Sequence, residues 1–322
     1  MIKNYIIKML YKKGFMRTMY PYANAQYGKF ELYSVMNRNE NDYHYIITKI
    51  RILSHEIEKG FSLPQPRKGF GRQKLVELDH LLDLYEKRYM GKDDYSYYVA
   101  ISVVNYYKCK AVEYDLDISF LESKRYDIGN PMFVGVNVVP QDVLCKYSYE
   151  ECYDFIKTRH SVREFKDKEL DFADIEKAIL GAQMAPSACN RQSVKVLHIN
   201  GKERCAKVLT IQNGAKGFSI VNDVFIVAAD LSNYIIPIES TTAFVDCGLF
   251  SMSFLLSLHS LGIGSCPLLW NDESERAIEL RKLVKIPENY EISLVIPAGY
   301  YKDKVKYAIS TRKPFNMVYE KI

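Results

Sequence analysis

One stretch restricts the fold of this chain more than any other. It is the nearly all-apolar run TTAFVDCGLFSMSFLLSLHSLGIG (residues 241–264), which ends in glycines and has the length of a helix. A helix that is apolar on every side must be buried, either in a large core or between subunits. The run is too short, and its flanks are too polar, for a membrane span of about 20 apolar residues. We therefore expect a buried helix over residues 243–261.

Composition indicates a globular protein with real cores. The chain has 322 residues, of which 48% are hydrophobic and 26% charged, enough for two domains. Its net charge of +5 is small for this length, and no basic run is interleaved with aromatic residues. We therefore expect no nucleic-acid partner, whereas a small anionic ligand fits this charge.

The seven cysteines form no C-x-x-C pair, and their odd number argues against a disulfide framework or a structural zinc site. We expect reduced thiols, no metal and a cytoplasmic protein. Residues 1–20 lack the features of a signal peptide and have the pattern of a basic amphipathic helix. Such a helix packs on its own protein more often than it contacts an anionic membrane surface, which stays the alternative.

Two halves differ in character. Residues 1–148 are predicted to form a mainly helical accessory domain, with helical periodicity over 43–59 and 72–89. Residues 130–143 are expected to be an extended connector. Residues 149–322 mix helices and strands, which predicts an α+β domain. Its expected elements are a helix over 148–160, a helix from 172 capped by Asp171, and β runs at 193–199, 223–230 and 291–301.

The usual catalytic templates are absent from the sequence: G-x-S-x-G, H-E-x-x-H, the P-loop and G-x-G-x-x-G. One remaining candidate is TRHSVREF (158–165), which places Arg159, His160, Ser161 and Arg163 within about one turn. Two guanidinium groups beside a hydroxyl suit a phosphate ester, because arginine binds phosphate oxygens in a bidentate manner. The alternative is a solvated, charged helix end.

A second candidate is the loop APSACNRQSV (185–194). The hydroxyl of Ser187 and the amides of Asn190 and Gln192 have a spacing that suits a single ligand. The alternative is a plain helix-to-strand turn opened by Pro186, since Ser and Asn are common in turns whatever they bind.

Together the two stretches resemble the nitroreductase-like, FMN-dependent oxidoreductase family. That family has R-[RH]-S-x-[RK]-x-F, matched at 159–165, and then A-P-S-x-x-N-x-Q, matched at 185–192. A buried helix followed by G-[LI]-G-[ST]-C is matched up to Cys266. The closing patterns P-E-x-Y, G-Y and R-x-P are matched at 287–290, 299–300 and 312–314. The resemblance covers about residues 150–322.

The resemblance implies a nitroreductase-like sheet flanked by helices, a homodimer with flavin sites shared between subunits, and FMN as cofactor. Pro186, Ser187, Asn190 and Gln192 would reach the flavin of the opposite subunit, and Pro267, Leu268 and Leu269 would lie near flavin N5. The resemblance implies that the FMN phosphate and ribityl chain would be bound by Arg159, Ser161, Arg163 and Arg312. His160 would contribute backbone or ring contacts. Whether Asn213 contacts the flavin stays open.

The implied activity is two-electron transfer from NADH or NADPH to a small organic acceptor, nitroaromatic or quinone-like, by a ping-pong mechanism. This scheme requires no acid or base from the protein, so no catalytic residue is assigned. Many members have Pro-Trp where this chain has Ser193 and Val194, so the substrate does not follow from the resemblance. The alternative is a non-catalytic flavin-binding or scaffold protein on the same fold.

The N-terminal half lies outside this resemblance. Residues 55–62 followed by Gly69-Phe-Gly71 resemble an N-terminal extension found on some bacterial nitroreductase-like proteins. We expect it to cover the flavin cleft, and a docking module that delivers a substrate or partner is the alternative.

Overall fold

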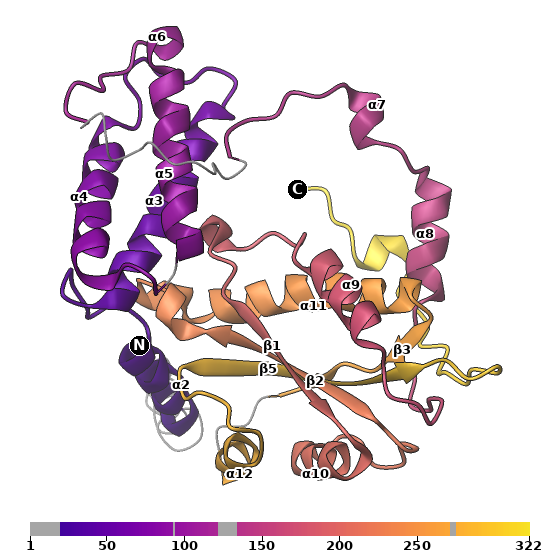
Figure 1. Cartoon of the computed structure of the whole chain (residues 1–322). Helices are drawn as coiled ribbons and strands as arrows, with labels where there is room; N and C mark the ends of the chain where they lie inside the picture. The colour runs from indigo at the N-terminus through magenta and orange to yellow at the C-terminus, as the bar shows by residue number, and fades with distance from the viewer. Residues whose placement is uncertain (1–19, 93, 122–133, 271–274) are drawn as a thin grey trace, which may run out of the picture.

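The C-terminal half is built on an antiparallel sheet, seen in a computed structural model that describes residues 20–92, 94–121, 134–270 and 275–322 (Figure 1). The strand order is β1-β2-β5-β3, and β4 pairs with β5 beside this path. The bounds are β1 Val194–Asn200, β2 Asp223–Asp230, β3 Ile263–Ser265, β4 Leu268–Leu269 and β5 Tyr290–Tyr300. These bounds confirm the predicted β runs to within a few residues.

Strand β2 is buried on both faces, as its run of apolar residues predicted. Alternate side chains point to opposite faces of a strand. Phe225, Val227 and Ala229 therefore enter one core with α9 (Phe172–Ala182) and α11 (Thr242–Ser260). Val224 and Ile226 enter another core with α10 (Lys202–Gln212) and α12 (Glu275–Val284). The sheet thus lies between two helical layers, which confirms the α+β class.

Helix α11 confirms the buried helix predicted from the apolar run. Phe254 and Leu258 are fully buried against the sheet, and Cys247 is fully buried as well. The expectation that this run is too short for a membrane span is wrong, because the helical segment Pro237–Ser260 is long and apolar enough to cross a membrane by length and composition alone. Its packing on β2 and β5 is that of a core helix. However, Val245 is 57% exposed, so the helix keeps an apolar face that the described residues do not cover.

The N-terminal half is helical in its described parts, as predicted. Helices α3 (Tyr43–Phe61), α4 (Arg72–Tyr89) and α5 (Asp94–Cys109) enclose a separate core, followed by the short α6 (Ala111–Tyr114). Helix α2 (Tyr20–Tyr33) does not join them. Its Phe30 packs in the core of α11, and its Lys29 forms a 2.7 Å ion pair with Glu291 of β5. The division at residue 148 stays a prediction.

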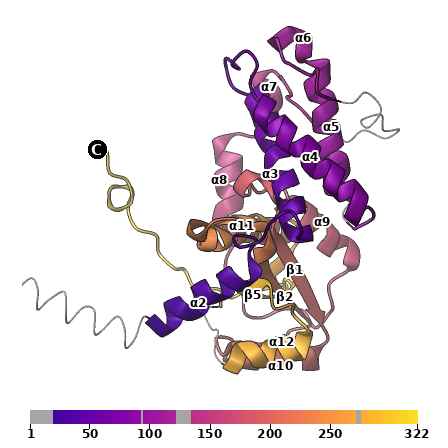
Figure 2. The same ribbon diagram turned by 90° about the vertical axis from the view of Figure 1, so that its left-hand side faces the viewer.

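Two peripheral segments leave the body of the molecule. The predicted extended connector is wrong at its end, because α7 (Gln141–Leu144) is helical. In α8 (Tyr149–Thr158), which a Ser148–Glu151 capping box begins, every residue is exposed. Residues 302–322, including the short η5 (Phe315–Met317), are also exposed throughout and run away from the sheet (Figure 2).

One predicted cap is wrong in its chemistry. Asp171 does stand at the N-cap of α9, but its side chain makes no capping hydrogen bond. Its carboxylate instead accepts hydrogen bonds from Lys168 Nζ (2.9 Å) and the Tyr300 hydroxyl (3.0 Å), which offer stronger partners than a backbone amide. The predicted amphipathic helix of residues 1–20 lies outside the described residues, except for Tyr20.

Candidate functional site

The arginine motif lies against strand β3. Helix α8 ends at Thr158, the chain becomes extended at Arg159, and Ser161 forms a parallel bridge with Ser265. The Val162 amide donates to the Ser265 carbonyl at 3.0 Å. A Cβ on Gly264 would come within 2.8 Å of the Tyr301 ring, so only glycine permits this close approach.

Arg159 holds an unsatisfied donor at this place. Its Nη1 atom is buried and has no hydrogen-bond partner among the residues that the structure describes. A buried polar group without a partner costs about 1–3 kcal/mol, more when it is charged. Arg163 is exposed, and its Nη1 donates to the Ser161 carbonyl at 3.3 Å. The segment therefore presents guanidinium donors that an anion could satisfy.

The pKa of Cys266 shows which side chains lie near the end of strand β3. Burial raises the pKa of the Cys266 thiol, while the charges of Arg163 and Arg159 and a hydrogen bond with Ser161 act in the opposite direction. Both arginines and the hydroxyl of Ser161 therefore lie near the residue that precedes Pro267. We call Arg159, His160, Ser161, Arg163 and Arg312 the basic cluster.

His160 connects Arg312 to the basic cluster. Its ring stacks on Tyr307 at 3.7 Å between centroids. Burial lowers the pKa of His160, and the positive charges of Arg159 and Arg312 lower it further. Arg312 therefore lies close enough to His160 to affect its pKa, although its Nη1 donates to the Ser310 carbonyl at 2.6 Å.

His259, on the last turn of α11, adjoins the basic cluster and was missed by sequence reasoning. Its Nε2 lies 3.0 Å from the Thr158 hydroxyl and its Nδ1 lies 2.9 Å from the Tyr301 hydroxyl. Burial lowers its pKa, and the charges of Arg159 and His160 add to the effect. A hollow of about 230 Å³ lies between His160, His259 and the two tyrosines Tyr301 and Tyr307. No motif marks His259, because its role depends on a contact across about 100 residues of sequence.

The loop at 185–192 adopts an unusual backbone. Cys189, Asn190 and Gln192 have φ angles of 49°, 50° and 50°, in the left-handed region. Asparagine tolerates this region, whereas cysteine and glutamine are strained there. The Ser187 hydroxyl accepts a hydrogen bond from the Gln192 amide at 3.1 Å. The side-chain amides of Asn190 and Gln192 are exposed and have no hydrogen-bond partner within the described part of the chain.

A buried carboxylate holds this loop in place. Asp246 of α11 is 3% exposed, and its Oδ1 accepts from the Ala188 amide at 3.0 Å. Its Oδ2 accepts from the Tyr234 hydroxyl at 3.0 Å and from the Ser193 hydroxyl at 3.2 Å. A single acid in an apolar helix should be paired when buried, so Asp246 could have been singled out from sequence.

Arg191 supports the loop from the other side. This side chain is buried, and its Nε donates to the Ala188 carbonyl at 2.9 Å. Its Nη1 donates to the Asn233 carbonyl at 2.9 Å, and its Nη2 lies 2.7 Å from Glu239 Oε1. These bonds fix the backbone on which Asn190 is displayed.

The two motifs lie at different ends of α11. The loop is bonded to Asp246 near the start of the helix, whereas the basic cluster adjoins His259 near its end. These residues are thirteen positions apart, which corresponds to about 20 Å along a helix. Figure 1 agrees, with α8 beside one end of α11 and α3 beside the other. One chain therefore does not bring the predicted site residues together.

The segment predicted to lie near flavin N5 forms strand β4. Leu268 pairs with Val295 of β5, and Leu269 is 63% exposed. The Gln212 side-chain amide donates to the Leu269 carbonyl at 3.2 Å. Trp270 is 3% exposed and belongs to the core beneath the sheet, so its role is packing.

Known proteins resemble this chain over the part that carries both motifs. The nitroreductase family model matches residues 156–221 and 222–300. A protein of Archaeoglobus fulgidus, whose name proposes an NADH dehydrogenase or NAD(P)H nitroreductase, is 34% identical over 157 residues, which cover 48% of this chain and 88% of that protein. The chain belongs to the nitroreductase family. The predicted membership is confirmed, and residues 1–155 lie outside the family match.

Two further proteins match about half of this chain. A protein of Methanothermobacter thermautotrophicus with the same name is 29% identical over 160 residues, 48% of this chain and 80% of that protein. The solved structure of a Desulfovibrio desulfuricans protein described as a nitroreductase in complex with FMN is 18% identical, with a TM-score of 0.45. The match covers 53% of this chain and 95% of that one.

Proposed function

We propose that residues 149–322 bind FMN and transfer two electrons from NADH or NADPH to a small organic acceptor, nitroaromatic or quinone-like, by a ping-pong mechanism. The observation that carries the proposal is the buried Nη1 of Arg159, which lacks an acceptor among the described residues and lies within the basic cluster. A phosphate group supplies the acceptors that this donor lacks, and arginine suits phosphate geometry.

The residues present fit FMN. Arg159, Ser161, Arg163 and Arg312 would bind the phosphate and ribityl chain, with His160 beside them, and the exposed Leu269 would give the ring an apolar neighbour. FMN, when bound, supplies the redox chemistry, by taking up and releasing an electron pair. Positive charge at the site would favour the negative charge that develops on reduction.

We further propose that the site is completed by a second copy of the chain. The free amides of Asn190 and Gln192 and the basic cluster are separated by much of α11 within one chain. A two-fold related copy can bring the loop of one chain to the basic cluster of the other. Pro186 and Ser187 would then also belong to the partner's flavin site.

Exposed apolar surface supports this assembly. The exposed side chains lie on α8, on the outer face of α11 and in the C-terminal segment: Tyr149, Tyr153, Phe155, Ile156, Val245, Leu249, Met252, Ile309, Phe315, Met317, Val318 and Tyr319. Large exposed apolar patches mark interaction surfaces. The part of this segment beyond Tyr307, which is exposed throughout, gains a partner surface in a dimer.

The visible spectrum of the purified protein tests the cofactor. A yellow protein whose absorbance bleaches on addition of NADH or NADPH without oxygen, and returns when an acceptor such as a quinone is added, supports the proposal. A colourless protein that takes up no FMN on titration contradicts it and favours the non-catalytic alternative.

Mixed dimers test whether the site is shared. In a dimer with Asn190→Ala in one chain and Arg163→Ala in the other, a shared arrangement places both changes in the same site and leaves the second site intact. FMN titration should then give about one tight site per dimer. If each chain builds its own site, neither site is intact and no tight site remains. Light scattering should show a dimer throughout, and a folded, FMN-loaded monomer would rule out the shared site.

A further inference from the structure

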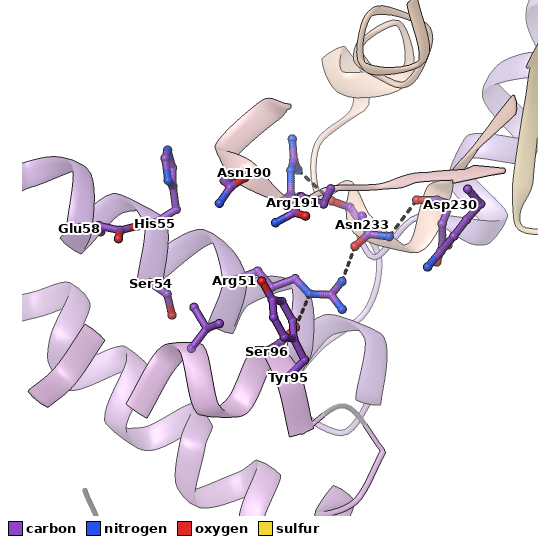
Figure 3. Close-up of a pocket in the computed structure, with 13 residues that line it drawn as sticks. Arg51, Ser54, His55, Glu58, Tyr95, Ser96, Asn190, Arg191, Asp230 and Asn233 are labelled. Atoms are coloured by element: carbon purple, nitrogen blue, oxygen red, sulfur yellow. Dashed lines mark hydrogen bonds between the residues drawn. The ribbon is translucent and has the colours of Figure 1, made fainter. Parts of the chain in front are cut away.

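A pocket of about 260 Å³ lies between the N-terminal helices and the loop that carries Asn190 (Figure 3). Helix α3 contributes Arg51, His55 and Glu58 to its lining, and α5 contributes Tyr95. Figure 3 shows Arg51 and His55 on α3 across from Asn190 on the loop. The two halves of the chain thus share one pocket.

Hydrogen bonds within the N-terminal half and between the two halves hold the pocket walls together. Arg51 Nη1 donates to Asn233 Oδ1 at 2.5 Å, and its Nε donates to the Ser96 hydroxyl at 2.8 Å. The Thr48 hydroxyl donates to the Ser232 carbonyl at 2.9 Å, and both of these residues are buried. The pocket is therefore formed in the folded chain and needs no closure of one half on the other.

Both carboxylates of the pocket already accept hydrogen bonds from the protein. Glu58 Oε1 accepts from the Gly135 amide at 2.7 Å. Asp230 Oδ1 accepts from the Ser232 amide at 3.0 Å and from Asn289 Nδ2 at 2.7 Å. Because both carboxylates already accept hydrogen bonds from the protein, they need no cationic ligand as a partner.

Three hydrogen-bond donors of the pocket have no acceptor among the described residues. The ammonium of Lys195, exposed on β1, has no acceptor among the described residues, and the same holds for the exposed side-chain amides of Asn190 and Gln192. Burial lowers the pKa of His55 despite the opposing charge of Glu58, so its ring is a neutral hydrogen-bonding group at neutral pH. The aromatic ring of Tyr95 is 59% exposed and adds an apolar surface.

The pocket adjoins the proposed flavin loop. Gln192 and Lys195 also line a second hollow of about 300 Å³, together with Pro186 and Ser187. A ligand in the first pocket would therefore lie next to the residues proposed to reach the partner's flavin. A preformed pocket with a few converging polar groups is typical of a small-molecule site.

We propose that this pocket is the acceptor subsite and that it binds a small aromatic carboxylate, with the Lys195 ammonium as its counter-ion and Tyr95 of the N-terminal helices against its ring. The acceptor role rests on the proposed function, whereas anion binding itself does not. In this arrangement the accessory half selects the substrate.

Direct binding to the whole chain of residues 1–322 tests the site with benzoate and benzamide, two rings of similar size of which only the first is charged. Calorimetry should show that Lys195→Gln weakens benzoate binding about tenfold and leaves benzamide binding unchanged. Lys87→Gln is the matched control, because Lys87 is exposed on α4 outside the pocket and its replacement changes the net charge equally. Val99→Phe, which fills the pocket from α5, should weaken both ligands. Equal binding of benzoate to Lys195→Gln and to the wild type would overturn the proposal.

Kinetics with 4-nitrobenzoate and 4-nitrobenzamide test the acceptor role. Reduction of the nitro group to nitroso consumes two electrons and two protons and releases water, and NADH with one proton supplies them as it becomes NAD⁺. Lys195→Gln should raise KM about tenfold for 4-nitrobenzoate only, at unchanged FMN affinity. A raised KM for NADPH in place of 4-nitrobenzoate would assign the lysine to the donor's phosphate and overturn the proposal. Failure of the wild type to bind FMN, with benzoate binding intact, would contradict the proposed function and the acceptor role but not the anion site.

Discussion

Replacement of Asp246 tests how the loop at 185–192 is held. Asp246→Ala removes the acceptor of three hydrogen bonds, from the Ala188 amide and from the hydroxyls of Ser193 and Tyr234. The two hydroxyls lie 2.7 Å apart and can still bond to each other, so about two donors lose their partner. Each unsatisfied buried donor costs about 1–3 kcal/mol, which for two donors predicts a loss of about 2–6 kcal/mol in the free energy of unfolding.

This loss is a large fraction of the roughly 5–15 kcal/mol by which a typical protein is stable. Asp246→Asn keeps the shape and one acceptor oxygen, so we expect a smaller loss of about 1–2 kcal/mol. Both variants should also bind FMN at least about tenfold more weakly, because the strained loop is no longer held in its binding conformation.

Denaturant unfolding of the FMN-free protein, followed by circular dichroism, measures the first effect, and FMN titration measures the second. Asp303→Ala is the matched control, since Asp303 is almost fully exposed and pairs only with the surface residue Lys166 among the described residues. An Asp246→Ala protein that unfolds at the same denaturant concentration as the wild type would refute the reasoning.

Three further predictions follow from the cores and the basic cluster. Arg159→Met should leave the FMN-free protein as stable as the wild type or up to about 1 kcal/mol more stable, because the buried Nη1 has no acceptor among the described residues. The same change should weaken FMN binding by about 1.5–3 kcal/mol and leave riboflavin binding unchanged. Equal losses for both flavins would mean that the residue is structural. The pKa of His259 is lowered in the folded protein, so its contribution to stability is complete above pH 6.5 and is lost as the pH falls below this value. NMR titration should show that this pKa rises when inorganic phosphate or FMN offsets the charge of Arg159. An unchanged pKa would place the phosphate elsewhere. Phe30→Ala should lower the free energy of unfolding by about 3–4 kcal/mol. The fluorescence of the single tryptophan, Trp270, which reports on the C-terminal half, follows the transition. An unchanged transition would mean that α2 is not part of that core.

Sequence alone determined the local elements and the family. The periodicity over 43–59 and 72–89 predicted α3 and α4, the run at 223–230 predicted the fully buried β2, and the apolar run predicted α11. These features are readable because the burial of a face requires apolar side chains at the repeat of the helix or strand. The order of the motifs at 159–165 and 185–192 predicted the nitroreductase family for the same local reason, since each motif is a contiguous stretch.

Only the tertiary structure decided which segments meet. A pattern of apolar residues shows that a face is buried but not against which partner, so the sequence could not show that Phe30 packs with α11, that Asp246 holds the loop, or that His259 adjoins Arg159. These contacts join positions far apart in the chain, and their distances follow from the packing of whole helices on the sheet. The same packing places the two motifs near opposite ends of α11, and it brings α3 against the loop at 190 to form a pocket from two halves that the sequence treated as separate.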